Sequence, residues 1–135
     1  MKPEHAAEIA FSLGTRFEGA SGSNPEELLG AAFAGCFSMA LAAALEQAGT
    51  APKSVRTSAR VTVERQGWGG SGATKAPFEI FAVELTTEVD APGMDEGRLR
   101  EIVDVTRKHC PVGKALGSVP KLSVTASLAR GSPSA

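Results

Sequence analysis

The feature that most constrains the fold is a run from Leu28 to Leu45 that contains no charged residue. Asn24 just before it is a favourable N-cap, Pro25 suits the first helical position, and Glu27 can accept a hydrogen bond from a free backbone N–H. Gly49 supplies a stop at the other end. The pattern predicts one long helix that is apolar nearly all round, and such a helix is expected to be buried.

A membrane-spanning helix is the alternative for an uncharged run of this length. The run consists mostly of Ala, Gly and Ser, which gain little on transfer into lipid; Glu26 and Glu27 precede it and no basic cluster follows it. We therefore expect a central helix covered by a sheet, with no membrane partner. The small side chains would let the sheet or a partner helix approach closely.

Length and charge narrow the possible functions. The 135 residues predict a single domain spanning 1–135, and 14 Lys and Arg against 15 Asp and Glu give no basic surface for nucleic acid. The first residues lack the basic and apolar regions of a signal peptide, so we expect a cytoplasmic protein. Thiols stay reduced there, and the two cysteines are then more often catalytic, metal-binding or inert than a structural disulfide.

The remaining elements follow from alternation and turn residues. On one strand we expect Phe81, Val83, Leu85, Thr87 and Val89 to share one side. Asp95 can cap a helix that runs to about His109, and Pro111 begins a short one. Strands are predicted over 6–13, 54–65, 78–89 and 121–129, with a glycine-rich hairpin loop over 67–75 and a disordered tail over 130–135. The order predicts an α+β domain with a largely antiparallel sheet wrapped on the long central helix.

The two cysteines, Cys36 and Cys110, occupy different helical environments. Cys110 precedes Pro111 at a helix start, where free N–H groups and the helix dipole favour a thiolate or accept an attacking sulfur. Cys36 lies in the middle of an apolar helix and needs a cation to become ionised, for which Arg16 is the candidate. Equally, Cys36 can be a small buried hydrophobe, Arg16 a solvated charge and Glu26 an ordinary first-turn acid, and patterning alone leaves both interpretations open.

Three sequence blocks carry a family resemblance: TRFEG at 15–19, NPEELLGAAFAGCFSMAL at 24–41 and CPVGKAL at 110–116. In this order they resemble the OsmC/Ohr proteins, thiol-dependent peroxidases that reduce organic hydroperoxides, and the middle block is closer to the OsmC branch. The resemblance implies an OsmC-like fold, a peroxidatic Cys36, a resolving Cys110, and Arg16 with Glu26 as a supporting ion pair. It implies an antioxidant enzyme of the stress response that needs no cofactor.

The implied cycle is chemically consistent. The Cys36 thiolate, held ionised by Arg16, attacks the outer oxygen of the hydroperoxide and becomes a sulfenic acid. Cys110 condenses with it to a disulfide, which a dithiol must reduce. The resemblance implies a lipoylated protein as the reductant and an intertwined homodimer. Members of the family also carry a longer N-terminal strand region before the TRFEG block than the residues that precede Thr15 in this sequence.

Two details of this chain give further expectations. Ten helical residues separate Glu26 from Cys36, about 15 Å on a straight helix, so the two side chains cannot touch. Either the long Arg16 side chain reaches between them or the helix kinks around Gly30, and we predict a break or bend between Leu29 and Ala32. Phe33 stands where the family usually has histidine. We expect a more apolar pocket here, which would favour bulky or fatty peroxides.

Two alternatives to the peroxidase stay open from the sequence. One is a non-catalytic member of the same fold that binds a hydrophobic ligand. The other is a metal site formed by Cys36, Cys110 and His109, although their spacing matches no zinc pattern.

Overall fold

The computed structural model describes residues 23–65 and 78–129. In chain order the elements are α2 (Pro25–Gln47), β1 (Ser54–Arg65), β2 (Phe78–Asp90), α3 (Glu96–His109), α4 (Pro111–Ala115) and β3 (Lys121–Leu128). The strand predicted over 6–13, Arg16 with its sequence block, the glycine-rich loop and the C-terminal tail lie outside the described residues.

The predicted helix ends are confirmed. The side chain of Asn24 accepts a hydrogen bond from the Glu27 N–H at 2.8 Å, and that of Asp95 accepts one from the Arg98 N–H at 2.9 Å. After α2 the chain turns at Gly49, whose φ of 83° lies in the left-handed region that favours glycine. Local capping chemistry therefore fixes where both long helices begin and where α2 ends.

The sheet has the order β1-β2-β3 and is mixed. β1 and β2 pair antiparallel, whereas β2 and β3 pair parallel. The α+β class is confirmed, but the expectation of a largely antiparallel sheet is wrong for β3. Helices α3 and α4 carry the chain back to the end of the sheet where β2 begins, and a strand that follows such a crossover runs parallel to its neighbour.

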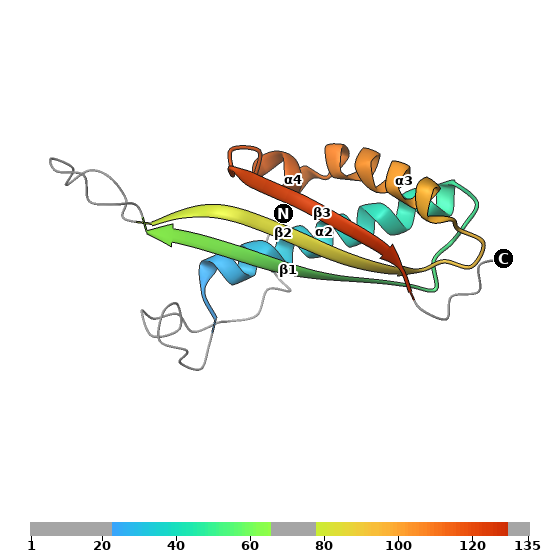
Figure 1. The fold of residues 1–135 in the computed structure, drawn as a ribbon, viewed down its shortest axis with the longest axis horizontal. Coiled ribbons are helices and arrows are strands. Elements are labelled where there is room, and N and C mark those ends of the chain that lie inside the picture. The colour runs from blue at the N-terminus through green and yellow to red at the C-terminus, as the bar shows by residue number, and fades with distance from the viewer. Residues whose placement is uncertain (1–22, 66–77, 130–135) are drawn as a thin grey trace, which may run out of the picture.

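Both long helices lie on one face of the sheet, α2 over β1 and α3 beside β3, and in Figure 1 the strands run lengthwise in front of α2. The core forms between these layers. Its fully or almost fully buried members are Phe33, Phe37, Leu41 and Leu45 of α2, Val83, Leu85 and Val89 of β2, and Leu99 and Val103 of α3. Cys110 belongs to this core, and Cys36 packs against it.

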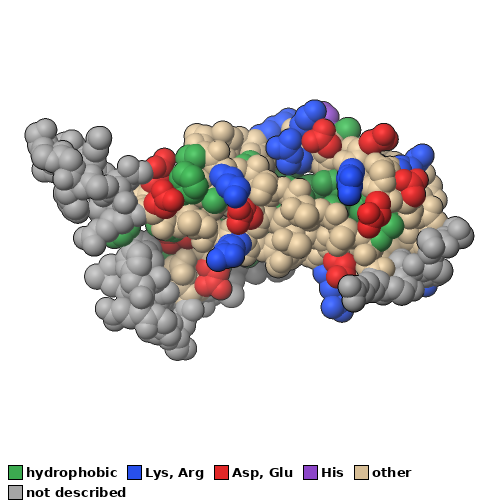
Figure 2. Space-filling view, in the orientation of Figure 1, with side chains coloured by type: hydrophobic (Ala, Val, Ile, Leu, Met, Phe, Trp, Pro, Cys, Tyr) green, Lys and Arg blue, Asp and Glu red, His purple; other side chains and the backbone are tan. Residues whose placement is uncertain are grey.

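The opposite face of the sheet is polar. Cross-strand pairs place Arg56 opposite Glu88 and Arg60 opposite Glu84, and Lys121 contacts Glu84 with an N–O distance of 2.8 Å. Figure 2 shows acidic and basic side chains interspersed on this side rather than gathered by sign. A sheet with one face on the core and one in water gives the alternation found in the sequence.

One residue of the predicted alternation is misplaced. The register shifts between Thr62 and Val63, which pair with Ala82 and Ile80, so Phe81 is the extra residue of a β-bulge. Its side chain is 36% exposed, whereas Val83 and Thr87 are fully buried. The placement of Phe81 on the buried side was wrong because the bulge interrupts the two-residue period that the prediction assumed.

The predicted break around Gly30 is also wrong, because α2 continues as a helix from Pro25 to Gln47. Gly30 has a different use. A Cβ built there would lie 2.7 Å from Cγ2 of Val61, closer than real contacts allow. The missing side chain therefore lets α2 lie directly on β1, and it does not serve to bend the helix.

Among the described residues, α2 is also the one helix long and apolar enough to cross a membrane by length and composition. Core helices pass the same test. Phe33, Phe37, Leu41 and Leu45 are completely buried, as expected of a core helix, but only 33% of the apolar window is buried, so the helix is covered on one side and not all round.

Candidate active site

The two cysteines meet. Cys36 lies at the middle of α2 and Cys110 at the junction of α3 and α4, 74 residues further on. The Cys110 thiol donates a hydrogen bond to Sγ of Cys36 across 3.1 Å. Both are free thiols; Cys36 is half-buried and Cys110 is completely buried.

The backbone of Cys110 is held on both sides. Its N–H donates to the carbonyl of Thr106 at 3.0 Å, and its own carbonyl accepts from the N–H of Lys114 at 2.9 Å. Its extended conformation ends α3, because a following proline disfavours the helical region. Pro111 is then the first residue of α4, so Cys110 lies at the junction of two helices, which we call the hinge.

Burial raises the pKa of the Cys110 thiol, and the hydrogen bond to Cys36 raises it further. The backbone N–H groups of Gly113 and Val112 act in the opposite direction and are outweighed. The expectation that the helix start favours a thiolate at Cys110 is therefore wrong. Helix α4 has only 5 residues, and desolvation of a completely buried sulfur exceeds what its short dipole supplies. Cys110 is the protonated partner and Cys36 the acceptor.

Phe33, where the resemblance led us to expect histidine, packs against the helix that follows Cys110. It precedes Cys36 by one helical turn and is completely buried. A Cβ built on Gly113 would lie 3.2 Å from the ring atom Cε1, so the ring packs directly against α4. The structure has a groove of about 600 Å³ between the start of α2 and β1, and Phe33 is not among the residues that line it, so the expected effect on an open substrate pocket finds no support in its position.

Glu26 lies at the N-terminal end of α2. It belongs to the first turn of α2, ten residues and about 15 Å from Cys36 along an unbroken helix. Arg16, the proposed link between them, lies outside the described residues. The described chain thus brings together two of the four candidate residues, Cys36 and Cys110.

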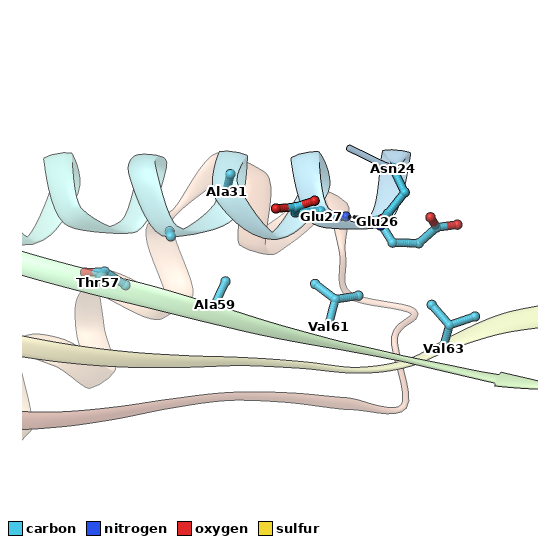
Figure 3. A pocket seen from close by; sticks show the side chains of 9 residues that line it. Asn24, Glu26, Glu27, Ala31, Thr57, Ala59, Val61 and Val63 are labelled. Carbon is cyan, nitrogen blue, oxygen red and sulfur yellow. Dashed lines mark hydrogen bonds between the residues drawn. The ribbon is translucent and has the colours of Figure 1, made fainter. Parts of the chain in front are cut away.

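Glu26 instead borders the groove of about 600 Å³ between the start of α2 and β1. Figure 3 shows alanine and valine side chains along its walls, with the polar residues gathered at the N-terminal end of the helix and Thr57 at the far end. The groove is lined by Asn24, Glu26, Glu27, Ala31, Ala34, Thr57, Ala59, Val61 and Val63. Neither cysteine is among these residues, so the groove and the thiol pair are separate features of α2.

A chain of three hydroxyl groups links α2 to the sheet and was not anticipated from the sequence. Ser38 donates to Oγ1 of Thr57 at 2.6 Å, and Thr57 and Thr87 share a hydrogen bond of 2.9 Å. Thr87 is completely buried. The available signal was a threonine on the apolar side of each of two paired strands, because a buried hydroxyl needs a partner.

The metal-site alternative is contradicted. It requires His109 beside both sulfurs, yet in residues 23–65 and 78–129 no three His, Cys, Asp or Glu side chains gather closely enough to hold an ion. His109 is exposed at the end of α3. The sulfurs have each other as partners instead.

The fold and site together define a class: a small α+β protein in which one thiol from a central helix meets a second from a later helix junction. A family model described as OsmC-like protein matches residues 18–125. The chain is 41% identical to peroxiredoxin OsmC of Escherichia coli over 106 residues, 78% of this chain and 68% of that one. It is 33% identical to the organic hydroperoxide resistance protein of Xanthomonas axonopodis pv. citri, over 72% of this chain and 61% of that one.

A solved structure shows the same fold. The organic hydroperoxide resistance protein OhrB of Bacillus subtilis superimposes with a TM-score of 0.65, covering 88% of this chain and 79% of that one, at 23% identity. The chain belongs to the OsmC-like protein family.

Proposed function

We propose that this protein is a thiol-dependent peroxidase that reduces organic hydroperoxides to alcohols. The observation that carries the proposal is the contact between the two sulfurs, 3.1 Å apart and contributed by different elements. The names of its relatives, peroxiredoxin OsmC and organic hydroperoxide resistance protein, support the same chemistry.

In the first step Cys36 is the nucleophile. It is half-buried, whereas Cys110 is completely buried, so a peroxide reaches Cys36 first. The Cys36 thiolate attacks the outer oxygen of the hydroperoxide, the O–O bond breaks, and the alkoxide takes up a proton and leaves as the alcohol. Cys36 remains as a sulfenic acid.

In the second step Cys110 resolves the sulfenic acid. Its sulfur attacks Sγ of Cys36, an S–S bond forms, and the S–O bond breaks. The departing hydroxide combines with the proton of Cys110 and leaves as water. The hinge that holds Cys110 beside Cys36 supports this role, because the reacting atoms start within contact distance.

A dithiol then reduces the disulfide. Cys36 carries the more accessible of the two sulfurs, so the reductant attacks there and Cys110 is the leaving group. A lipoylated protein of the cytoplasm supplies such a dithiol.

Arg16 and Glu26 complete the proposed site as an ion pair that keeps Cys36 ionised and stabilises the departing alkoxide. Replacing Arg16 with Lys and Glu26 with Gln, singly and together, tests the pair. We expect Arg16→Lys to slow the first step. Adding Glu26→Gln to Arg16→Lys should slow that step little further. Independent, additive losses would show that Glu26 does not act through Arg16 and would reject the ion pair.

We also propose a homodimer that uses the exposed side of α2. Leu28 is 37% and Met39 77% exposed, and between and beyond them Ala32, Gly35 and Ala43 continue an apolar stripe at helical spacing. Small residues on this stripe would let two helices approach closely. Sedimentation of the wild type and of Met39→Glu should give a dimer and a monomer respectively; a monomeric wild type would reject the proposal.

The decisive experiment is mass spectrometry after one equivalent of an organic hydroperoxide. We expect a Cys36–Cys110 crosslink in the wild type and oxidised, uncrosslinked Cys36 in Cys110→Ser. A protein that keeps both thiols and leaves the hydroperoxide intact would exclude peroxidase activity. Rates with tert-butyl, cumene and long-chain lipid hydroperoxides then rank the substrates.

A second candidate function is a non-catalytic carrier of hydrophobic ligands, for which the groove beside α2 is the candidate site: five of its nine lining residues are alanine or valine, and the other four are polar. A carrier would bind a fluorescent fatty acid and lose that binding in Val61→Glu, while consuming no hydroperoxide. A peroxidase consumes hydroperoxide whether or not the probe binds.

A further inference from the structure

We propose that Phe33 and Gly113 set the distance between the two sulfurs and act as positioning residues for disulfide formation. This inference rests on the proposed two-thiol cycle and deepens it, because it names the packing contact that controls the second step.

The contact joins the same two segments as the sulfurs do. Phe33 and Cys36 lie three residues apart on one side of α2, and Cys110 at the start of α4 lies three residues before Gly113. One pair meets through the two sulfurs, and the other through the ring atom Cε1 of Phe33. Both contacts therefore depend on the distance between α4 and α2.

The contact requires glycine on the α4 side, at position 113. A Cβ on Gly113 would lie 3.2 Å from Cε1 of Phe33 and 3.5 Å from Cβ of Cys110. The first distance is tighter than nine in ten real contacts, and the ring has little room to yield because Phe33 is completely buried in the core. An added methyl group would lift α4 instead, and Cys110 with it.

Disulfide formation is sensitive to such a lift. The sulfurs must close from 3.1 Å to the S–S bond length of about 2 Å, so α4 has to move toward α2 against the ring. A methyl group at position 113 would hold α4 further from α2 and so oppose this closure. The attack of a peroxide on Cys36 takes place before this movement and does not depend on it.

The test is Gly113→Ala, with dithiodipyridine as the oxidant in place of a peroxide. One thiol attacks the reagent and releases a first coloured pyridinethione; the second thiol attacks the mixed disulfide and releases another. We expect the first release to keep its wild-type rate and the second to slow roughly tenfold or more, because small misplacements of reacting groups cost large factors in rate.

Two further variants separate positioning from general damage. Phe33→Leu removes the ring edge, so the double variant Phe33→Leu/Gly113→Ala should regain most of the closure rate. Gly117→Ala is the matched control: its Cβ would lie equally close, 3.2 Å, to the carbonyl of Lys114 in its own turn, and not to Phe33. It should close at the wild-type rate.

Each outcome has a clear meaning. Wild-type closure in Gly113→Ala would overturn the proposal, and slow closure that Phe33→Leu does not relieve would remove Phe33 from it. A changed first release would show that the variant has lost its fold, and the double variant then carries the test alone. Because no peroxide is used, a protein that lacks peroxidase activity can still confirm or reject the positioning role.

Discussion

Helix α2 is joined to its neighbours on two flanks by polar atoms. On the flank toward α4, the half-buried Cys36 contacts the completely buried Cys110. On the flank toward β1, the half-buried Ser38 contacts Thr57, which leads to the completely buried Thr87. Two residues apart on a helix, Cys36 and Ser38 point in nearly opposite directions.

The two flanks have nearly the same design, so burial and contact distance alone do not identify the reactive one. Each pairs an accessible group on α2 with an inaccessible group on another element. They differ in chemistry: two sulfurs can be oxidised to a covalent bond, whereas hydroxyl groups at this site can only exchange hydrogen bonds. Disturbing the sulfur flank should therefore alter activity, and disturbing the hydroxyl flank should alter stability.

The largest expected effect is the difference in hydroperoxide reduction between Cys36→Ser and Ser38→Ala. Loss of the nucleophile should lower hydroperoxide reduction by about a thousandfold or more, whereas loss of the Ser38 hydroxyl should leave the rate within about threefold of the wild type. Steady-state consumption of cumene hydroperoxide with dithiothreitol measures both. Substantial activity in Cys36→Ser would show that the sulfur flank is structural too.

The next effect lies within the sulfur flank. Iodoacetamide should alkylate Cys36 at least roughly a hundredfold faster than Cys110, because Cys110 is buried and its pKa is raised by that burial. Digestion and mass spectrometry at successive times give both rates in one sample. Equal rates would mean that the hinge opens readily and that burial does not distinguish the two sulfurs.

A smaller effect, with a predicted direction, is the change in the rate of disulfide formation with pH. Burial raises the pKa of Cys110, so at neutral pH the attacking sulfur is mostly protonated and its thiolate fraction grows about tenfold per pH unit below that pKa. Disulfide formation should therefore accelerate steadily from pH 7 through the ordinary thiol range. Stopped-flow measurement of the step after Cys36 oxidation tests this, and a plateau below pH 8 would contradict the raised pKa.

Much of the fold was accessible from the sequence because it depends on local signals. Asn24 and Asp95 cap their helices through side chains three residues from their targets, and the alternation of β1 and β2 reports one wet face. The bulge at Phe81 and the parallel β3 could not be foreseen, since register and strand direction depend on partners distant in sequence.

The site shows the same division. The choice of the two cysteines as candidate site residues follows from their motifs, but the pKa of Cys110 does not: a helix start lowers a thiol pKa and burial raises it, and only packing decides between them. Gly30 is similar. Glycine in a helix predicts either a bend or a close approach, and the position of Val61 across the interface decides for the close approach.

The smallest effect tests the hydroxyl flank by itself. Thr87→Val keeps the shape of the side chain and removes its hydrogen bond to Thr57, which still holds Ser38, so we expect a loss of about 1 kcal/mol in the free energy of unfolding. Its neighbour Thr86 points to the polar face and is exposed, so Thr86→Val should change stability by less than about 0.5 kcal/mol. Urea unfolding measures both, with peroxidase activity assayed on the same samples. If Thr87→Val instead lowered activity while leaving stability unchanged, the hydroxyl chain would have to be connected to the thiol chemistry, and the two flanks of α2 would no longer be independent.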